Sequence, residues 1–387
     1  MNSPVPFAPP ASDHSYTVPN PGPSAPLAYT PAAEFQEEDE DQTTAELLET
    51  LRGISEKVAA DEGRAFRSVH AKAHGILHGH IDIPALPPVL AQGLFARPGR
   101  RPVVMRLSST PGDLLDDTVS TPRGLAIKVG DVDGMPLDAA DGSRSQDFLM
   151  VNGPVFSAPT ARKFLRSLKL LAATTDKAPA AKALLSAALR GLETVVEKAG
   201  GESATLKALG GHPATHPLGD TYFTQVPLLY GSYMAKLSLA PASPGLLALN
   251  GAPVDLQAGP NALRDAVAAH CAQAGGVWEL RAQLCVDLDR MPIEDASVEW
   301  PQDLAPFVTV ARITVPPQAA WDDATSPAED NALAFSPLRG LADHRPLGSI
   351  MRVRRRAYAM AVQFRQAYNA AAADPGAAQK FGVVASP

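Results

Sequence analysis

The stretch FRSVHAKAHGILHGHIDI, residues 66–83, combines a strand pattern with a high density of imidazoles, because it holds four of the nine histidines of the chain. Residues two apart in an extended strand share a face, so His74, His78 and His80 would lie on one side. At roughly 7 Å for every two residues, three such histidines are spread along the strand. These three histidines form either a polar strand face or part of a metal site, and the rest of the sequence decides between the two interpretations.

Short strand-like runs continue after this stretch, separated by Gly, Pro and Asp. The first group is GILHGHIDI (75–83), PVVMRLSST (102–110), GLAIKVGD (124–131) and DFLMVN (147–152). The second group is TYFTQVPLL (221–229), YMAKLSLA (233–240), WELRAQLCVDL (278–288) and FVTVARITV (307–315). Two groups of four strands predict a closed, antiparallel, eight-stranded β-barrel.

Helical patterns lie before, between and after the two groups of strands. A Thr cap and apolar residues at helical spacing predict a helix that begins near residue 42. Further helices are expected over 158–175, 178–201, 262–275 and 348–371. The fold class is therefore α+β, a barrel with helical additions.

The composition of the two ends predicts one folded domain over 42–375. Residues 1–33 contain nine prolines, and an acidic run follows at 34–42, so residues 1–41 are expected to be a disordered tail. Residues 376–387 are expected to form a flexible C-terminus.

Charge and cysteine content limit the classes of function. The net charge is −7 and the pI is about 5.7, which argues against general binding of nucleic acid. Cys271 and Cys285 form no CxxC motif, which suits a reducing compartment, and we expect a cytoplasmic protein. No apolar run reaches about 18 residues, so no membrane span is expected.

Four segments, in order over about 90 residues, resemble signatures of the haem catalases. RSVHAKAHG (67–75) resembles the family's RVVHAKG, and PVVMRLSS (102–109) resembles its VRFS strand. DDTVSTPRGLAIKV (116–129) is similar to DTVRDPRGFAVKF, and LMVNGPVF (149–156) is similar to NNTPVFF. The resemblance extends over roughly residues 45–370, and it implies the catalase fold.

A C-terminal segment carries the same resemblance. AFSP occupies 334–337, where catalases have AFDP, and Tyr358 follows Phe335 by 23 residues. Arg354 lies four residues before Tyr358 and Arg365 seven after it, as in the family's Arg-x-x-x-Tyr helix. These spacings place the three side chains on one helix face. An adjacent guanidinium favours the phenolate that an iron ligand must be.

The resemblance implies a haem b enzyme that consumes hydrogen peroxide or organic hydroperoxides. Tyr358 would be the iron ligand, His70 the distal acid–base group, Ser108 the group that orients it, and Asn152 a hydrogen-bond donor to peroxide. The other cofactor-binding residues implied are Arg67, Val69, Arg106, Phe156, Arg354 and Arg365. Under this interpretation His70 is the chemically active histidine, whereas His74, His78 and His80 form a polar strand face.

Departures from the family leave two other interpretations open. Ser157 stands where catalases usually keep a second Phe. The long arms and wrapping loop of the family are also expected to be missing, and a smaller chain would have a shorter, wider channel that admits larger hydroperoxides. A haem enzyme that rearranges or cleaves fatty-acid hydroperoxides is one alternative, and a non-catalytic scaffold with the catalase fold is the other. A homo-oligomer, either a dimer or a tetramer, is also expected.

Overall fold

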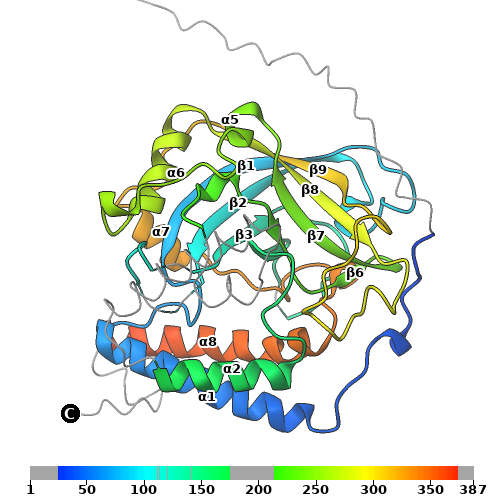
Figure 1. The fold of residues 1–387 in the computed structure, drawn as a ribbon, viewed down its shortest axis with the longest axis horizontal. Helices are drawn as coiled ribbons and strands as arrows, with labels where there is room; N and C mark the ends of the chain where they lie inside the picture. The colour runs from blue at the N-terminus through cyan, green and yellow to red at the C-terminus, as the bar shows by residue number, and fades with distance from the viewer. Residues whose placement is uncertain are drawn as a thin grey trace, which may run out of the picture.

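The computed structural model describes residues 25–110, 112, 114–119, 121–140, 142–174 and 213–373. In these ranges a β-barrel lies above a layer of long helices (Figure 1). The strands are β1 (Ala73–Ile83), β2 (Gly99–Ser109), β3 (Arg123–Val129), β4 (Gln146–Val151), β5 (Tyr222–Phe223), β6 (Leu228–Tyr230), β7 (Tyr233–Pro241), β8 (Gly276–Leu284) and β9 (Val308–Val315).

Eight of these strands close into a ring. The sheet order is β5–β4–β3–β2–β1–β9–β8–β7–β6, and β5 also pairs with β7, so that β6 lies outside the ring. All of these strand pairs are antiparallel. The predicted eight-stranded antiparallel barrel and the α+β class are therefore confirmed. Closure matters physically because it leaves the ring strands without unpaired edges.

The first strand shows why this sequence forms a barrel wall. Leu77 and Ile81 are fully buried, and Leu77 lies opposite Met105 of β2 in the strand register. His78, between them, is exposed. This alternation places one face of β1 in the main core and the other toward the outside, as the period of two requires.

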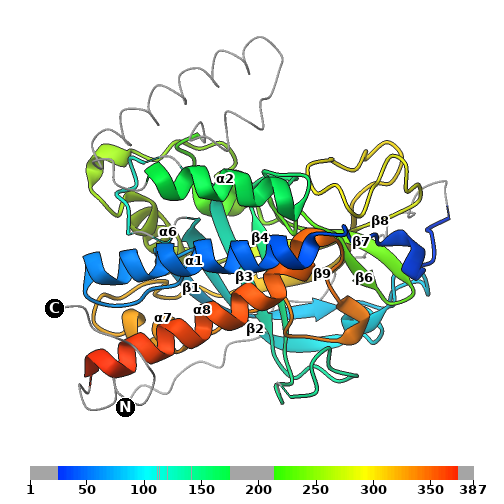
Figure 2. The same ribbon diagram turned by 90° about the horizontal axis from the view of Figure 1, so that it is seen from below.

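Three long helices form a layer under the barrel, namely α1 (Glu40–Glu62), α2 (Ala161–Thr174) and α8 (Ser349–Ala373). They lie side by side when the molecule is seen from below (Figure 2). Leu47 of α1, Leu165 of α2 and Val353 of α8 meet in one apolar cluster. Gly63 ends α1 in the left-handed conformation, with φ 68°, which glycine adopts without a steric cost. Because α8 carries the predicted Arg-x-x-x-Tyr motif, this layer positions half of the candidate site.

Two further helices bear on the site. Helix α6 (Ala262–Gln273) is the helix that the pattern over 262–275 predicts, and it packs beside β1. Helix α7 (Ser326–Ala332) is short and also contacts β1. Helix α5 (Pro244–Leu247) and short 3-10 turns connect the remaining elements.

The segment before α1 corrects the predicted domain boundary. Residues 25–41 were expected to belong to the disordered tail, yet Ala28 forms a β-bridge with Tyr233, and residues 31–33 form a 3-10 turn. The backbone N–H of Leu27 donates to the carbonyl of Cys285 at 2.8 Å. The acidic run is therefore held on the domain, because its carboxylates meet arginines that are distant in sequence.

Some predictions fall outside the described residues. These are the helix over 178–201, the tail over 1–24 and the C-terminus over 376–387. Within the part of the chain that the structure describes, no helix is both long enough and apolar enough to cross a membrane.

Candidate functional site

His70 is held at the entrance to β1 by backbone and side-chain contacts. Its φ is 58°, a left-handed conformation that is uncommon outside glycine, and its N–H donates to the carbonyl of Thr110 at 2.8 Å. The carbonyl of His70 accepts from Arg106 Nη1 at 2.9 Å. A backbone strain of this kind persists only where neighbours determine it, and it is typical of functional positions.

The imidazole of His70 lies between Ser108 of β2 and Gly124 of β3. Nδ1 is 3.1 Å from Ser108 Oγ, and Ser108 Oγ lies 3.4 Å from the carbonyl of Gly124. Both contacts are satisfied when the serine hydroxyl donates to that carbonyl and accepts from Nδ1–H. This assignment leaves Nε2 as the unprotonated nitrogen of the ring. The two β-strands thus set both the orientation and the tautomer of His70.

Gly124 allows the imidazole this close approach. A Cβ at position 124 would lie 2.3 Å from both Cε1 and Nδ1 of His70. Real Cβ atoms do not occur at such distances, so only glycine fits under the ring. This glycine lies within the segment DDTVSTPRGLAIKV, and the sequence alone does not predict its role beside His70. The feature of the sequence that could have indicated it is the Pro-Arg-Gly triplet at the beginning of a predicted strand.

The surroundings of His70 keep its ring neutral. Loss of hydration and the charges of Arg106, Arg354 and Arg67 lower its pKa to about 3. A neutral imidazole with a free Nε2 can accept a proton at neutral pH. The structure thus gives the predicted acid–base residue the protonation state that such a role requires.

Arg67 and Arg106 converge on one carboxylate, that of Asp330 in α7. Arg67 Nη1 donates to Oδ1 at 3.0 Å, and Arg106 donates from Nε to Oδ1 at 2.5 Å and from Nη2 to Oδ2 at 3.2 Å. Arg365 is near enough for its charge to lower the pKa of Arg67. Three of the predicted arginines, Arg67, Arg106 and Arg365, are therefore brought together, and their carboxylate partner Asp330 was not predicted from the sequence.

On α8, Arg354 and Tyr358 form a direct pair. Arg354 Nη2 donates to the hydroxyl oxygen of Tyr358 at 2.8 Å, and the guanidinium lies 5.3 Å from the ring centroid. The i, i+4 spacing brings the two side chains together, as the sequence predicts. The phenol oxygen of Tyr358 therefore has a cationic hydrogen-bond donor as its direct neighbour.

Asn152 follows β4 and is tied to the start of β3. Its Oδ1 accepts from the N–H of Arg123 at 2.8 Å, and its Nδ2 donates to Asp220 at 3.0 Å. Arg123 also forms an ion pair with Asp220 at 2.6 Å. Since Arg123 precedes Gly124, these bonds fix the backbone beneath His70. One N–H of the Asn152 amide is used in this way.

The two apolar residues of the predicted site differ in exposure. Phe156 packs edge-on against Phe164 of α2, with ring centroids 5.1 Å apart. Val69 is 41% exposed beside His70. Phe156 therefore has a packing role between α2 and the barrel, whereas Val69 lies at the open side of the site.

The three histidines of β1 have separate partners. His78 pairs with Glu329 and His80 pairs with Asp82, both near the surface. His74 is fully buried, with Nε2 2.6 Å from Ser109 Oγ, so it does not belong to the polar strand face predicted for it. A bulge between Ala73 and Gly75 accompanies this change of environment.

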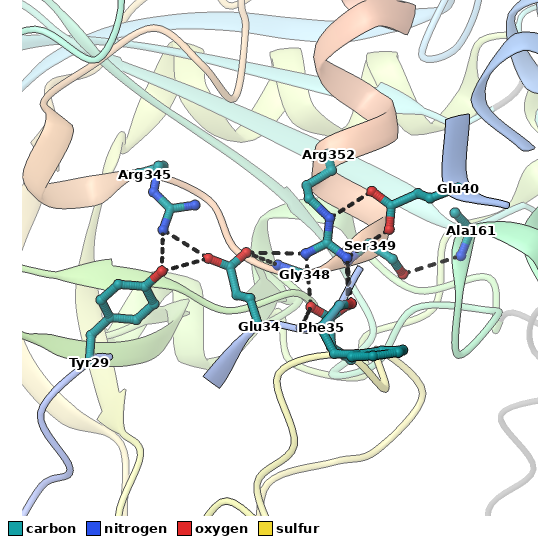
Figure 3. Close-up of polar contacts among 10 residues, drawn as sticks. Tyr29, Glu34, Phe35, Glu40, Ala161, Arg345, Gly348, Ser349 and Arg352 are labelled. Atoms are coloured by element: carbon teal, nitrogen blue, oxygen red, sulfur yellow. Dashed lines mark hydrogen bonds and ion pairs between the residues drawn. The ribbon is translucent and has the colours of Figure 1, made fainter. Parts of the chain in front are cut away.

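A network of ion pairs fixes the beginning of α8 against the N-terminal segment (Figure 3). Arg352 donates to Glu40 at 2.7 and 2.8 Å and to Glu294 at 2.8 and 3.0 Å. Glu34 accepts from Arg345 at 2.8 Å and from the N–H of Gly348 at 3.1 Å. Neither Glu34 nor Arg352 was singled out from the sequence. Together they set the position of the helix that presents Arg354 and Tyr358.

This barrel, with a long C-terminal helix packed beneath it, is the fold of the catalases. The chain is similar to catalase A from Saccharomyces cerevisiae, with a TM-score of 0.55 and 16% identity, over 90% of this chain and 68% of that chain. It is also similar to a fungal catalase, with a TM-score of 0.54 and 17% identity, over 94% of this chain and 70% of that chain. No protein-family model and no curated protein sequence matches the chain.

Proposed function

We propose that this protein is a haem-dependent enzyme that consumes hydrogen peroxide or organic hydroperoxides. The main support is that one chain with the catalase fold contains both a neutral histidine, His70, in contact with Ser108 and a tyrosine, Tyr358, paired with Arg354. The first group suits proton transfer and the second suits ligation of ferric iron.

The side chains present suit both the iron and the propionate groups of a haem. Tyr358, hydrogen-bonded by Arg354, would hold the iron as a phenolate. Arg67, Arg106 and Arg365 carry three positive charges, and among the described residues Asp330 is the one acidic group bonded to them. The remaining positive charge suits the two propionates of a haem.

Haem iron, when bound, supplies the centre at which the O–O bond of a peroxide is broken. His70 Nε2 would accept the proton of the attacking peroxide hydroxyl and return it to the departing oxygen. Ser108 holds the ring in the tautomer that this transfer needs. Among the described residues, the Asn152 amide donates to Asp220 alone, so its second N–H would be the one to donate to peroxide.

The proposal is tested by turnover of the full chain reconstituted with haemin. Consumption of hydrogen peroxide and of tert-butyl hydroperoxide is compared for the unmodified protein, His70→Gln and His78→Gln. Loss of the acid–base group should reduce the rate by about 10²–10⁴-fold. His78→Gln is the matched control, since His78 lies on β1, the strand that follows His70, and pairs with Glu329 at the surface.

Two outcomes would contradict the proposal. Equal turnover in His70→Gln and His78→Gln would remove His70 from the chemistry. Haem binding without consumption of either peroxide would identify a binding protein instead. The ratio of rates for the two peroxides reports whether the site favours hydrogen peroxide or larger substrates.

A further inference from the structure

The cluster formed by Arg67, Arg106, Arg365 and Asp330, hereafter the arginine cluster, has an excess of positive charge in a poorly hydrated place. The side chain of Arg106 is 2% exposed and that of Arg67 is 17% exposed. Burial, with Arg106 nearby, lowers the pKa of Arg67 to about 9, even though Asp330 acts in the opposite direction. Burial also lowers the pKa of Arg365. One carboxylate therefore neutralises the cluster only in part.

A cavity adjoins this cluster. Its volume is about 180 Å³, and its lining includes Arg67, Asp330 and Arg365. Arg64 and Arg264 add two more guanidiniums to the wall, with Arg264 stacked 4.2 Å from the ring centroid of Trp321. An anion that enters this cavity would meet several guanidiniums and one internal carboxylate.

Asp330 accepts hydrogen bonds from the same arginine N–H groups that would bind such an anion. Its two oxygens face the nitrogens of Arg67 and Arg106, at 2.5–3.2 Å. Although burial alone would raise the pKa of Asp330, the bonds and charges of the two arginines lower it. The carboxylate is therefore ionised and is a direct rival of any carboxylate brought by a ligand.

The arginines would keep their places without Asp330. Arg67 Nη2 also donates to the backbone carbonyls of Asp330 and Leu333, at 2.6 and 2.8 Å. Arg106 also donates to the carbonyls of His70 and Ala71, at 2.9 and 3.2 Å. These bonds involve backbone atoms, so a change of the Asp330 side chain leaves both guanidiniums directed at the same point.

We infer that Asp330 is an internal counter-anion that occupies the arginine cluster and is displaced from Arg67 and Arg106 by the carboxylates of a dianionic ligand. This rests on the proposed function, in which the ligand is haem with two propionates. Asp330 would stabilise the ligand-free protein, and it would weaken ligand binding by competing for the same donors. Removing its charge should therefore move the two properties in opposite directions.

The test compares two probes on the full-length protein. Haemin carries two carboxylates, and haemin dimethyl ester carries none. Titration followed by Soret absorbance gives the dissociation constant of each. Asp330→Asn should tighten haemin binding by about tenfold, the scale of one charged hydrogen bond, and leave the ester unchanged. It should also lower the melting temperature of the ligand-free protein.

Two other variants keep the test independent of folding. Glu329→Gln changes the neighbouring acidic residue, which pairs with His78 at the surface, and should affect neither probe. Asn331→Asp adds a negative charge to the cavity wall and should weaken haemin binding without weakening binding of the ester. Weaker or unchanged haemin binding in Asp330→Asn, or an equal change for the ester, would overturn the inference.

Failure of the proposed function would be visible separately. If the Soret band of neither porphyrin changes on addition of any variant, the protein does not bind haem. Inorganic pyrophosphate then serves as a multiply charged anionic probe, at constant ionic strength. A larger rise in melting temperature for Asp330→Asn than for the unmodified protein would support the counter-anion role, and an equal rise would overturn it.

Discussion

Replacement of Gly124 by alanine tests how tightly the imidazole of His70 is enclosed. The new Cβ would lie 2.3 Å from Cε1 and Nδ1 of His70, and 3.1 Å from Ser108 Oγ. Carbon atoms in contact are about 3.5–4.0 Å apart, so the ring must move by roughly 1 Å or more. A movement of that size breaks the 3.1 Å contact between Nδ1 and Ser108.

The expected cost combines two effects. Overpacking a filled site costs about 1–3 kcal/mol, and loss of one hydrogen bond costs about 0.5–1.5 kcal/mol. We therefore expect Gly124→Ala to lower the free energy of unfolding by about 1.5–4.5 kcal/mol, measured by urea denaturation. Peroxide consumption of the haemin-loaded protein should fall as well, because His70 leaves its position.

Gly153→Ala is the matched control. A Cβ at residue 153 would meet only Gln225 Nε2, at 3.8 Å, which is an ordinary contact. Both substitutions remove the same backbone freedom from the unfolded chain, so that contribution cancels in the comparison. Equal stabilities of the two variants, within about 0.5 kcal/mol, would refute the close packing of His70 on Gly124.

Two further predictions concern buried ionisable side chains. Burial lowers the pKa of His344 to about 4, and its Nε2 accepts the N–H of Leu94 at 2.9 Å, so the folded protein holds this ring neutral. Since the folded pKa lies below the unfolded value of about 6.5, stability should fall as the pH drops from 6.5 to 4, by roughly 3 kcal/mol from this residue. Urea denaturation at a series of pH values should show a weaker dependence in His344→Gln, and an unchanged dependence would contradict this. Lys72 and Asp117 are both buried, and Lys72 donates to Asp117 at 2.7 Å and to two backbone carbonyls. Lys72→Met should cost about 3–5 kcal/mol, because it leaves the buried Asp117 carboxylate without its charged partner. Arg52→Met, at an exposed pair with Glu56, should cost less than about 0.5 kcal/mol, and similar losses in both variants would disprove the distinction.

The barrel could be predicted because its strands have a local signature. Leu77 and Ile81 are buried in β1 while His78 is exposed, and the Gly, Pro and Asp between the runs mark the turns. The motif around His70 also fixes the relation between β1 and β2, because Ser108 must lie opposite the start of β1. The spacing of Arg354 and Tyr358 likewise gives their contact directly, since both lie on one helix.

The rest of the site depends on contacts between distant segments. Asp330 meets Arg67 across 263 residues, and no local pattern marks a carboxylate in α7 as its partner. Glu34 meets Arg345 across 311 residues, so an acidic run that reads as a solvated boundary is instead held on the domain. His74 follows the strand period, yet it is buried, and it lies at the register shift between Ala73 and Gly75 that the strand period does not predict.

The most direct test of the central claim is the absorption spectrum of the haemin-reconstituted protein, compared with Tyr358→Phe and Tyr368→Phe. Tyr368 lies on the same helix and donates to the carbonyl of Ala59 at 3.0 Å, so its substitution controls for a general effect on α8. We predict a strong Soret band in the unmodified protein and in Tyr368→Phe, with a band that is shifted or lost in Tyr358→Phe. No Soret band in the unmodified protein, or identical spectra for all three, would contradict iron ligation by Tyr358.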